Sequence, residues 1–139
     1  MLTCTFFGHR DAPETLAPQL ERVLTELIEK KNVTRFYVGN NGNFDSLVRR
    51  TLEKLSAHYP IAYDVVLSHV PKSNASYAAH TVLPEGIETV LPRFAVVWRN
   101  KWMIRNSDVV VCYVKYSFGG AASFRSLAEK EGKMLIDLI

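Results

Sequence analysis

The stretch from Ser107 to Phe124 constrains the fold more than any other part of the sequence. Val109–Val114 is a continuous apolar run rich in β-branched residues, which is typical of a strand buried on both faces of a parallel sheet. Gly119-Gly120-Ala121 follow, and a helical stretch runs from Ser123 to Glu131. This order leaves uncovered backbone N–H groups at a helix N-terminus, where an anion binds. The sequence therefore predicts a phosphate-bearing ligand.

The rest of the chain alternates between short apolar strands and amphipathic helices. Right-handed crossovers between such strands build a parallel sheet with helices on both faces. We predict a single Rossmann-like α/β domain over residues 1–139, with three layers around a mostly parallel five-stranded sheet. Numbered along the chain, the strands take the default doubly wound order 3-2-1-4-5. The predicted strands are Leu2–Phe7, Arg35–Val38, Ile61–Leu67, Val109–Val114 and Lys133–Leu138, and the helices begin near Pro13, Asn43, Phe94 and Ser123.

Glycine-rich and polar loops follow the strands at one end of this sheet. Ligands of doubly wound sheets bind outside the carboxyl ends of the strands, where the winding reverses. The predicted order places Gly8-His9-Arg10 and Phe118-Gly119-Gly120-Ala121 on the two walls of that crevice. Asn40–Asp45 and the irregular stretch Ser68–Arg93 open at the same end. The long stretch is typical of a lid or binding loop, and we expect a short helix around Ser76–Thr81 within it.

The side chains in these loops are the candidates for chemistry. Arg10 offers a fork suited to phosphate, and His9 is a residue type often used in acid/base chemistry. A solvated arginine and a loop-bonding histidine are the alternatives. Asp45 lies in the first turn of a helix, where the helix dipole alone accounts for a carboxylate. It is also one of few carboxylates near the crevice, so we take Asp45 and His9 as candidate catalytic residues. The candidate ligand contacts are Gly8, His9, Arg10, Asn41, Gly42, Asp45, Arg99, Asn100, Ser117, Gly119, Gly120, Ala121 and Ser123.

The predicted helix from Phe94 to Arg105 is rich in aromatic and basic residues. We expect its apolar run Val96-Val97-Trp98 to pack on the sheet and Met103 to lie in the core. Arg99 and Asn100 are expected to reach the edge of the crevice.

Composition and charge indicate which cellular compartment and which kinds of partner are favoured. The net charge of +3, from 17 basic and 14 acidic residues, fits a phosphate-binding cleft and weak nucleic-acid contact equally well. Cys4 and Cys112 lie in predicted strands and make no disulfide framework, which favours the cytoplasm and a buried apolar role for both. The chain starts with a strand rather than a signal peptide, and no apolar run approaches the ~20 residues of a membrane span. The histidines lack metal-ligand spacing, so we expect neither a metal nor a required cofactor.

Several short motifs, in order along nearly the whole chain, resemble the SLOG superfamily, the Rossmann-like group that contains the Smf/DprA and LOG proteins, and in particular its small YpsA-like branch. The resemblance implies a three-layer α/β fold that binds a nucleotide or nucleotide-derived ligand in the crevice described above. It adds Gly39, Phe44 and Trp102 to the candidate contacts. The matching motifs are Phe7-Gly8-His9-Arg10, Gly39–Asp45, Arg99-Asn100-Lys101-Trp102-Met103 leading into Asn106-Ser107-Asp108, Gly119-Gly120-Ala121, and Gly132-Lys133.

The resemblance also bears on catalysis. LOG enzymes cleave the N-glycosidic bond of nucleoside monophosphates and carry the signature Pro-Gly-Gly-x-Gly-Thr-x-x-Glu, in which the glutamate is the catalytic acid/base. The matching stretch Phe118–Ser126 lacks both the threonine and the glutamate, and Ser126 occupies the place of the carboxylate. Without that glutamate, no group at this position assists departure of the base or stabilises the oxocarbenium-like transition state of N-glycosidic bond cleavage. The resemblance therefore favours ligand binding over hydrolysis of the LOG kind.

Three functions stay open at this point. The first is a binding module or sensor for a nucleotide or nucleotide sugar. The second is an N-glycosidic-bond hydrolase acting on nucleotides, in which Asp45 or a carboxylate of Ser68–Arg93 replaces the missing glutamate and His9 assists. The third, suggested by the DprA resemblance, is single-stranded nucleic-acid binding by exposed aromatics with Arg49, Arg50, Lys54, Arg99 and Arg105. A homodimer through the apolar faces of the helices that begin near Asn43 and Phe94 is compatible with each.

Overall fold

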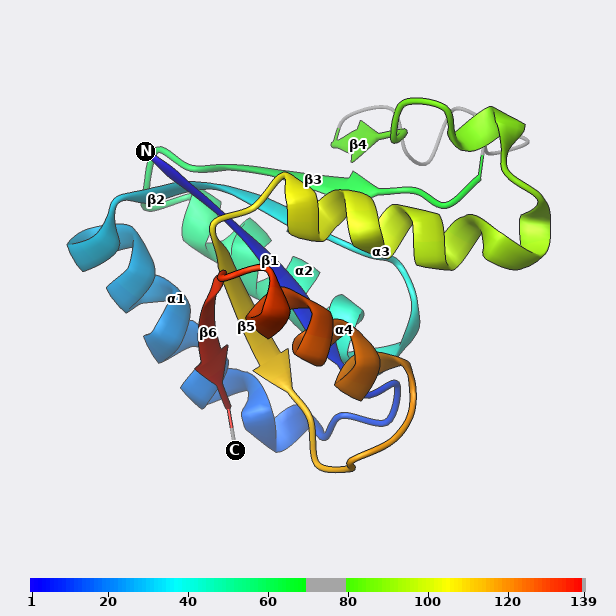
Figure 1. Ribbon diagram of the computed structural model, residues 1–139. Coiled ribbons are helices and arrows are strands. Elements are labelled where there is room, and N and C mark those ends of the chain that lie inside the picture. Colours follow the sequence, from blue (N-terminus) through cyan, green and yellow to red (C-terminus); the bar gives the residue numbers. More distant parts are fainter. Residues whose placement is uncertain (70–79, 139) are drawn as a thin grey trace.

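A six-stranded parallel sheet runs through the middle of the molecule (Figure 1). The computed structural model describes residues 1–69 and 80–138. The strands follow the order β4-β3-β2-β1-β5-β6, and each neighbouring pair is parallel. The strands are β1 Leu2–Gly8, β2 Val33–Val38, β3 Ala62–Val66, β4 Thr81–Val82, β5 Val109–Tyr113 and β6 Met134–Asp137. The helices are α1 Ala17–Lys31, α2 Gly42–Ser56, α3 Ala95–Arg105 and α4 Gly120–Lys130, with 3-10 turns η1 Glu14–Leu16, η2 Ile87–Thr89 and η3 Pro92–Phe94.

The predicted strand order is confirmed, with one strand added. The order β3-β2-β1-β5-β6 is the doubly wound order expected from the sequence. The added strand, β4, pairs with the outer edge of β3, where the N–H of Leu67 donates to the carbonyl of Val82 over 2.9 Å. A strand of two residues has no alternation to detect, so this part of Ser68–Arg93 was expected to be irregular. Of the short helix expected around Ser76–Thr81, residues 76–79 lie outside the described residues and Thr81 belongs to β4.

The helices cover the two faces of the sheet in pairs. One core cluster joins α1 and α2 to the sheet, and a second joins α3 and α4 to its opposite face. β5 serves both: Val109 and Val111 belong to the first cluster, and Val110 and Cys112 to the second. The five residues of β5 are buried, as its continuous apolar run predicted. The three-layer α/β prediction is thereby confirmed.

The predicted orientation of the α3 run is wrong. Val96, Val97 and Trp98 do not pack on the sheet; they are 40%, 42% and 39% exposed. The helix instead turns the positions of Ala95, Arg99 and Met103, spaced four residues apart, toward the protein. The hydrophobic pattern favoured the wrong face because the residue at the centre of the buried face, Arg99, is charged. Met103 lies in the core as expected.

The apolar face of α2 is fully used within the chain. Its five predicted core residues are all buried, so this face is not available to a second copy. No helix in residues 1–69 and 80–138 has the length and apolar character needed to cross a membrane. The five buried residues are Phe44, Leu47, Val48, Leu52 and Leu55.

Candidate functional site

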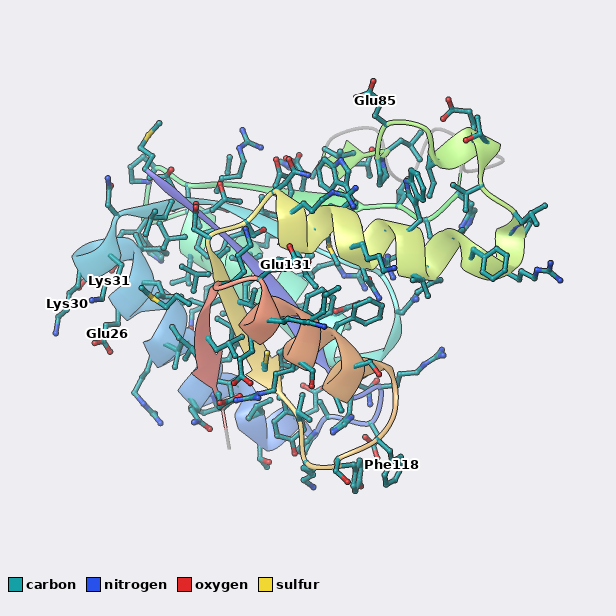
Figure 2. All side chains as sticks on the ribbon, in the orientation of Figure 1. Glu26, Lys30, Lys31, Glu85, Phe118 and Glu131 are labelled. Atoms are coloured by element: carbon teal, nitrogen blue, oxygen red, sulfur yellow. The ribbon has the colours of Figure 1, made fainter. Side chains whose placement is uncertain are left out.

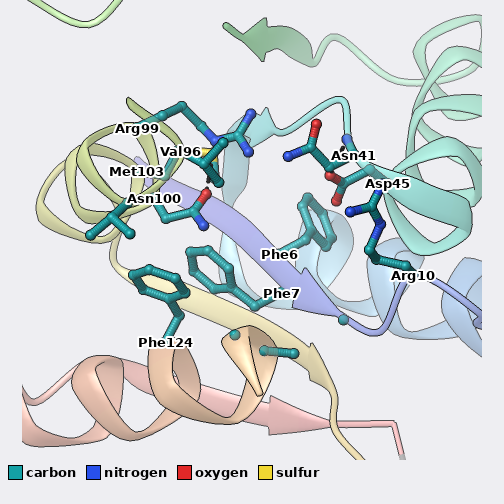
Figure 3. Close-up of a pocket in the computed structure, with 14 residues that line it drawn as sticks. Phe6, Phe7, Arg10, Asn41, Asp45, Val96, Arg99, Asn100, Met103 and Phe124 are labelled. Carbon is teal, nitrogen blue, oxygen red and sulfur yellow. Dashed lines mark hydrogen bonds between the residues drawn. The ribbon is translucent and has the colours of Figure 1, made fainter. Parts of the chain in front are cut away.

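A cavity of about 290 Å³ lies where β1 ends, between the N-termini of α2 and α4 and one side of α3 (Figure 3). This is the end of the sheet and the reversal of winding that the sequence predicted. Figure 3 shows Arg10, Asn41 and Asp45 on one side of the cavity and Phe7, Phe124 and Asn100 on the other. The apolar lining is Phe6, Phe7, Val96, Val97, Met103 and Phe124; the polar lining is Arg10, Asn41, Asp45, Arg99 and Asn100; and Gly8, Gly120 and Ala121 complete it.

The N-terminus of α4 forms one edge of the cavity through Gly120 and Ala121. Gly119 precedes the helix with φ 94°, in the left-handed region that glycine enters without strain. No side chain caps this helix, and its first turn holds no acidic residue. The first N–H groups of a helix lack intrahelical partners and carry partial positive charge. A Cβ placed on Gly120 would meet nothing within 4 Å, so this edge is open to an anion.

Two glycines bring the loop after β1 against the start of α2. Gly8 packs on the ring of the fully buried Phe44, and a Cβ at Gly8 would overlap the ring carbons. Gly42 has φ 87°, and a Cβ there would lie 2.7 Å from the Cα of Arg10. The backbone N–H of Asn43 donates to the carbonyl of Arg10 over 2.9 Å. These contacts hold Arg10 at the cavity, while Phe44 supports it from the core.

Asp45 is the one carboxylate among the described residues that line the cavity. Its Oδ2 accepts the backbone N–H of Asn41 over 2.9 Å, which holds the turn before α2. Burial raises the pKa of the Asp45 carboxyl; the Asn41 hydrogen bond and the charges of Arg99 and Arg49 oppose that rise without cancelling it. Gly39 lies behind this group, since a Cβ on it would be 2.8 Å from Asp45 Oδ2. In the described part of the chain no three His, Cys, Asp or Glu side chains form a group able to hold a metal ion.

Arg99 joins three parts of the site from inside the protein, where it is only 2% exposed. Its Nε donates to Asn100 Oδ1 over 2.7 Å on the same helix. Its Nη1 donates to Asn40 Oδ1 and to the Val66 carbonyl, each over 3.1 Å. In the amide orientation that satisfies its hydrogen bonds, Asn41 accepts from Nη2 over 3.1 Å. Arg99 therefore positions α3, the end of β3 and the turn before α2, and its donors are used for that purpose.

The charges around the cavity favour an anion. Arg10 and Arg99 bring two guanidinium groups to its lining, against the single carboxylate of Asp45. Burial lowers the pKa of Arg99, and the charge of Asp45 raises it in part. Arg49, one turn along α2 from Asp45, adds a third cation whose Nε is buried with no partner in the described residues. A phosphate is an effective counterion for such a group of cations.

Half of the predicted contacts line the cavity. They are Gly8, Arg10, Asn41, Asp45, Arg99, Asn100, Gly120 and Ala121. The remainder lie beside or behind it, namely His9, Gly39, Gly42, Phe44, Trp102, Ser117, Gly119 and Ser123.

His9 faces the loop between β5 and α4 instead of the cavity. Its Nε2 accepts the backbone N–H of Lys115 over 2.7 Å, and its ring lies 4.8 Å from that of Tyr116. The structure therefore does not bring His9 together with Asp45 as a catalytic pair. Trp102 also lies away from the cavity, with its ring edge-on to Tyr37 at 5.0 Å.

The apolar lining was missed by sequence reasoning. Phe7 and Phe124 stack with centroids 5.4 Å apart and planes inclined by 21°. The sequence held one usable signal, because Phe6-Phe7 are the last side chains of β1 before Gly8 and so lie at its carboxyl end. Phe124 gave no such signal, since it reaches the cavity only through the packing of α4 on β1.

The basic residues assigned to nucleic acid do not form one free surface. Arg50 donates to both carboxylate oxygens of Glu14 over 2.8 and 3.0 Å. Lys54 pairs with Glu21 at 2.7 Å. Arg99 is buried and Arg49 is half-buried. Arg105 is exposed and forms no ion pair within the described residues.

Comparisons with known proteins concern the fold. No family model matches the chain, and no curated protein matches it in sequence. DNA processing protein A (DprA) from Helicobacter pylori matches in three dimensions with TM-score 0.69 and 18% identity, and that from Streptococcus pneumoniae with TM-score 0.60 and 13% identity. The chain shares their fold.

The match involves nearly all of this chain and only part of each DprA chain. It covers 98% of this chain in both cases, but 64% of the Helicobacter chain and 58% of the Streptococcus chain. The chain therefore spans less than two thirds of the length of these neighbours. The Helicobacter pylori protein has a single-stranded DNA binding mode. At the level of the fold, the match agrees with the resemblance to the Smf/DprA and LOG group.

Proposed function

We propose that the cavity binds a small nucleotide or nucleotide-derived anion and that the chain acts as a binding module or sensor for it. The observation that carries the proposal is the meeting of three features in one cavity. The open N-terminus of α4 and Arg10 suit a phosphate. Phe7 and Phe124 supply an apolar aromatic wall for a flat base. Asn41 and Asn100 bring amide groups of the kind that pair with the polar edge of a base or sugar.

The size of the cavity limits the ligand. At about 290 Å³ it lies just below the ~300–1,000 Å³ that is usual for small-molecule sites. One nucleotide unit is of the right size, whereas a whole dinucleotide is too large to be enclosed. Nucleoside monophosphates and nucleotide sugars held by their nucleotide half are the favoured ligands.

We place the chain in the YpsA-like branch of the SLOG group and in the cytoplasm as part of the same proposal. The motif order supports the branch. Two buried thiols, Cys4 and Cys112, support a reducing compartment.

The test compares two substitutions at one position. Gly120→Asp places a carboxylate where the phosphate is expected, and Gly120→Ala adds only a methyl group; both fit, because a Cβ at Gly120 meets nothing within 4 Å. The four nucleoside 5′-monophosphates are titrated calorimetrically and by thermal shift. A ligand at 100 times its Kd adds about 2.7 kcal/mol of stability. We expect binding by the wild type and Gly120→Ala and at least tenfold loss in Gly120→Asp. Equal affinity in all three would contradict the phosphate position.

Hydrolysis is separated from binding by analysing each titrated mixture for free base. Asp45 is the group on which an N-glycosidase at this site would depend, as the one carboxylate in the described lining. A binder keeps its affinity in Asp45→Asn and releases no base. Release of base by the wild type, lost in Asp45→Asn, would establish the enzyme.

Single-stranded nucleic-acid binding is a second candidate. It is supported by the fold shared with DprA and by α3, the helix that lines one side of the cavity, whose exposed side carries Trp98, Lys101 and Arg105. The expected signature is an affinity for oligodeoxynucleotides that falls steeply as salt rises. An affinity independent of salt would remove this candidate without affecting the mononucleotide site.

A further inference from the structure

The loop between β5 and α4 carries aromatic side chains that the cavity does not use. Tyr116 and Phe118 are 44% and 71% exposed. Their rings stack on each other with centroids 5.4 Å apart and planes inclined by 22°. Figure 2 shows Phe118 at the outer side of this loop, away from the helices. An aromatic ring this exposed adds little hydrophobic stabilisation to the fold. Core packing therefore does not explain why aromatic side chains occupy these positions, and exposed apolar groups of this kind often mark a binding surface.

The stack is held in place from the protein side. The ring of His9 lies 4.8 Å from that of Tyr116, on the inner side of the loop. The Nε2 of His9 accepts the N–H of Lys115, and the backbone N–H of His9 donates to the Tyr113 carbonyl over 3.3 Å. The loop is thus tied to the ends of both β1 and β5. We refer to the stacked rings of Tyr116 and Phe118 as the platform. Because the loop that carries it is already fixed, the platform loses little conformational entropy when a ligand stacks on it.

The platform leads directly into the edge of the cavity. Phe118 is followed by Gly119 and Gly120, and neither glycine has another residue within 4 Å of its Cβ position. Gly120 also lines the cavity, as does Phe124 one turn further along α4. The N-terminus of α4 therefore separates an inner aromatic wall from an outer one. Lys115, an exposed residue of the same loop, adds a positive charge near Tyr116.

We propose that the ligand extends out of the cavity as a second nucleoside, joined through the phosphate at the α4 N-terminus, and that its base stacks on Phe118 and Tyr116. This rests on the proposed function, because the first nucleotide must occupy the cavity. A phosphate-linked second base is the shared chemistry of a pyrophosphate-linked dinucleotide and of a short single strand. Stacking on an aromatic platform accepts every base, because each presents a flat π face.

The experiment compares ligands with one and two bases on matched variants. The probes are the nucleoside 5′-monophosphates, the corresponding dinucleoside monophosphates, and NAD as the pyrophosphate-linked form. The variants are Phe118→Ala, Phe118→Trp and Phe94→Ala, the last a 51% exposed phenylalanine on η3 that does not line the cavity. Affinities are measured by calorimetry, and circular dichroism confirms that each variant is folded.

The expected result is selective. In Phe118→Ala the affinity for two-base ligands falls about 5- to 150-fold, which corresponds to the loss of one stacked base, while the affinity for monophosphates is unchanged. Phe118→Trp and Phe94→Ala bind both classes as the wild type does. A loss seen with NAD alone assigns the site to pyrophosphate-linked dinucleotides, and a loss seen with the dinucleoside monophosphates alone assigns it to a strand.

Other results overturn the inference. If the monophosphates bind and Phe118→Ala leaves the two-base affinities unchanged, the platform is no binding site and the proposed function stands. If two-base affinity falls in Phe94→Ala and not in Phe118→Ala, the second base lies at η3 and the inference is wrong. If neither class binds the wild type, the proposed function fails and the inference with it.

Discussion

Replacing Arg99 by alanine is the sharpest test of how the site is assembled. The guanidinium is buried and donates to Asn100, to Asn40 and to the carbonyl of Val66, a residue with no exposed surface. Removing it leaves the Val66 carbonyl without its side-chain donor, at a cost of about 1–3 kcal/mol. The lost hydrogen bonds to the partly buried amides and the cavity left behind add to this cost. The variant no longer has to bury a charged guanidinium, which offsets part of the loss. We expect a net loss of about 3 kcal/mol.

A loss of that size is large for a domain of this length. Domains are stable by about 5–15 kcal/mol, and the midpoint of a chain of this size falls by roughly 3 °C per kcal/mol. The variant should therefore melt roughly 10 °C below the wild type. It should also lose nucleotide affinity well below its midpoint, because Asn41 and Asn100 no longer have the side chain that positions both of them.

The assay is urea unfolding followed by circular dichroism, with nucleotide titration at 15 °C. Arg99→Lys keeps the charge without the planar fork and is expected to be intermediate. Lys101→Ala, at an exposed position of the same helix, is the control and should change stability by less than about 0.5 kcal/mol. If Arg99→Ala matches that control in stability or keeps full nucleotide affinity, Arg99 does not position the site.

Three further predictions follow from burial and backbone geometry. Because burial raises the Asp45 pKa, the folded state holds this proton more tightly than the unfolded state, so ionisation opposes folding as pH rises. Asp45→Asn should therefore raise the melting temperature at pH 7 and leave it unchanged near pH 3. Burial raises the pKa of the Cys112 thiol to about 12. Burial also raises the pKa of the Cys4 thiol well above its usual value. A thiol reagent at pH 8 should therefore label neither cysteine until urea unfolds the chain. Gly42→Ala should lower the free energy of unfolding in urea by more than about 2 kcal/mol, because the new methyl group overlaps Arg10 and the left-handed backbone is also strained. Gly132→Ala is the control. Gly132 also has a positive φ but has open space around it, so this change should cost about 1 kcal/mol. Equal losses of stability in Gly42→Ala and Gly132→Ala would show that the backbone moves to relieve the overlap with Arg10.

The sequence alone determined the order of five of the six strands and the end of the sheet that carries the cavity. The run Val109–Val114 is apolar at every position, which only a strand covered on both faces tolerates, and β5 is such a strand. Once β5 is an interior strand, the winding rule places the loop after β1 opposite the glycines at the start of α4. Arg10 from that loop and Gly120 both line the cavity. These inferences rest on local pattern and chain topology, which depend little on side-chain detail.

The tertiary structure decided which side chains reach the cavity. Sequence periodicity shows that α3 has an inner face, but hydrophobicity placed Val97 inside and Arg99 at the edge. The reverse holds because Asn40 and Val66, far away along the chain, supply oxygens that solvate a buried guanidinium. His9 is turned from the cavity in the same way by the N–H of Lys115. A polar side chain goes where its partners are, and partners distant in sequence meet only after the chain has folded.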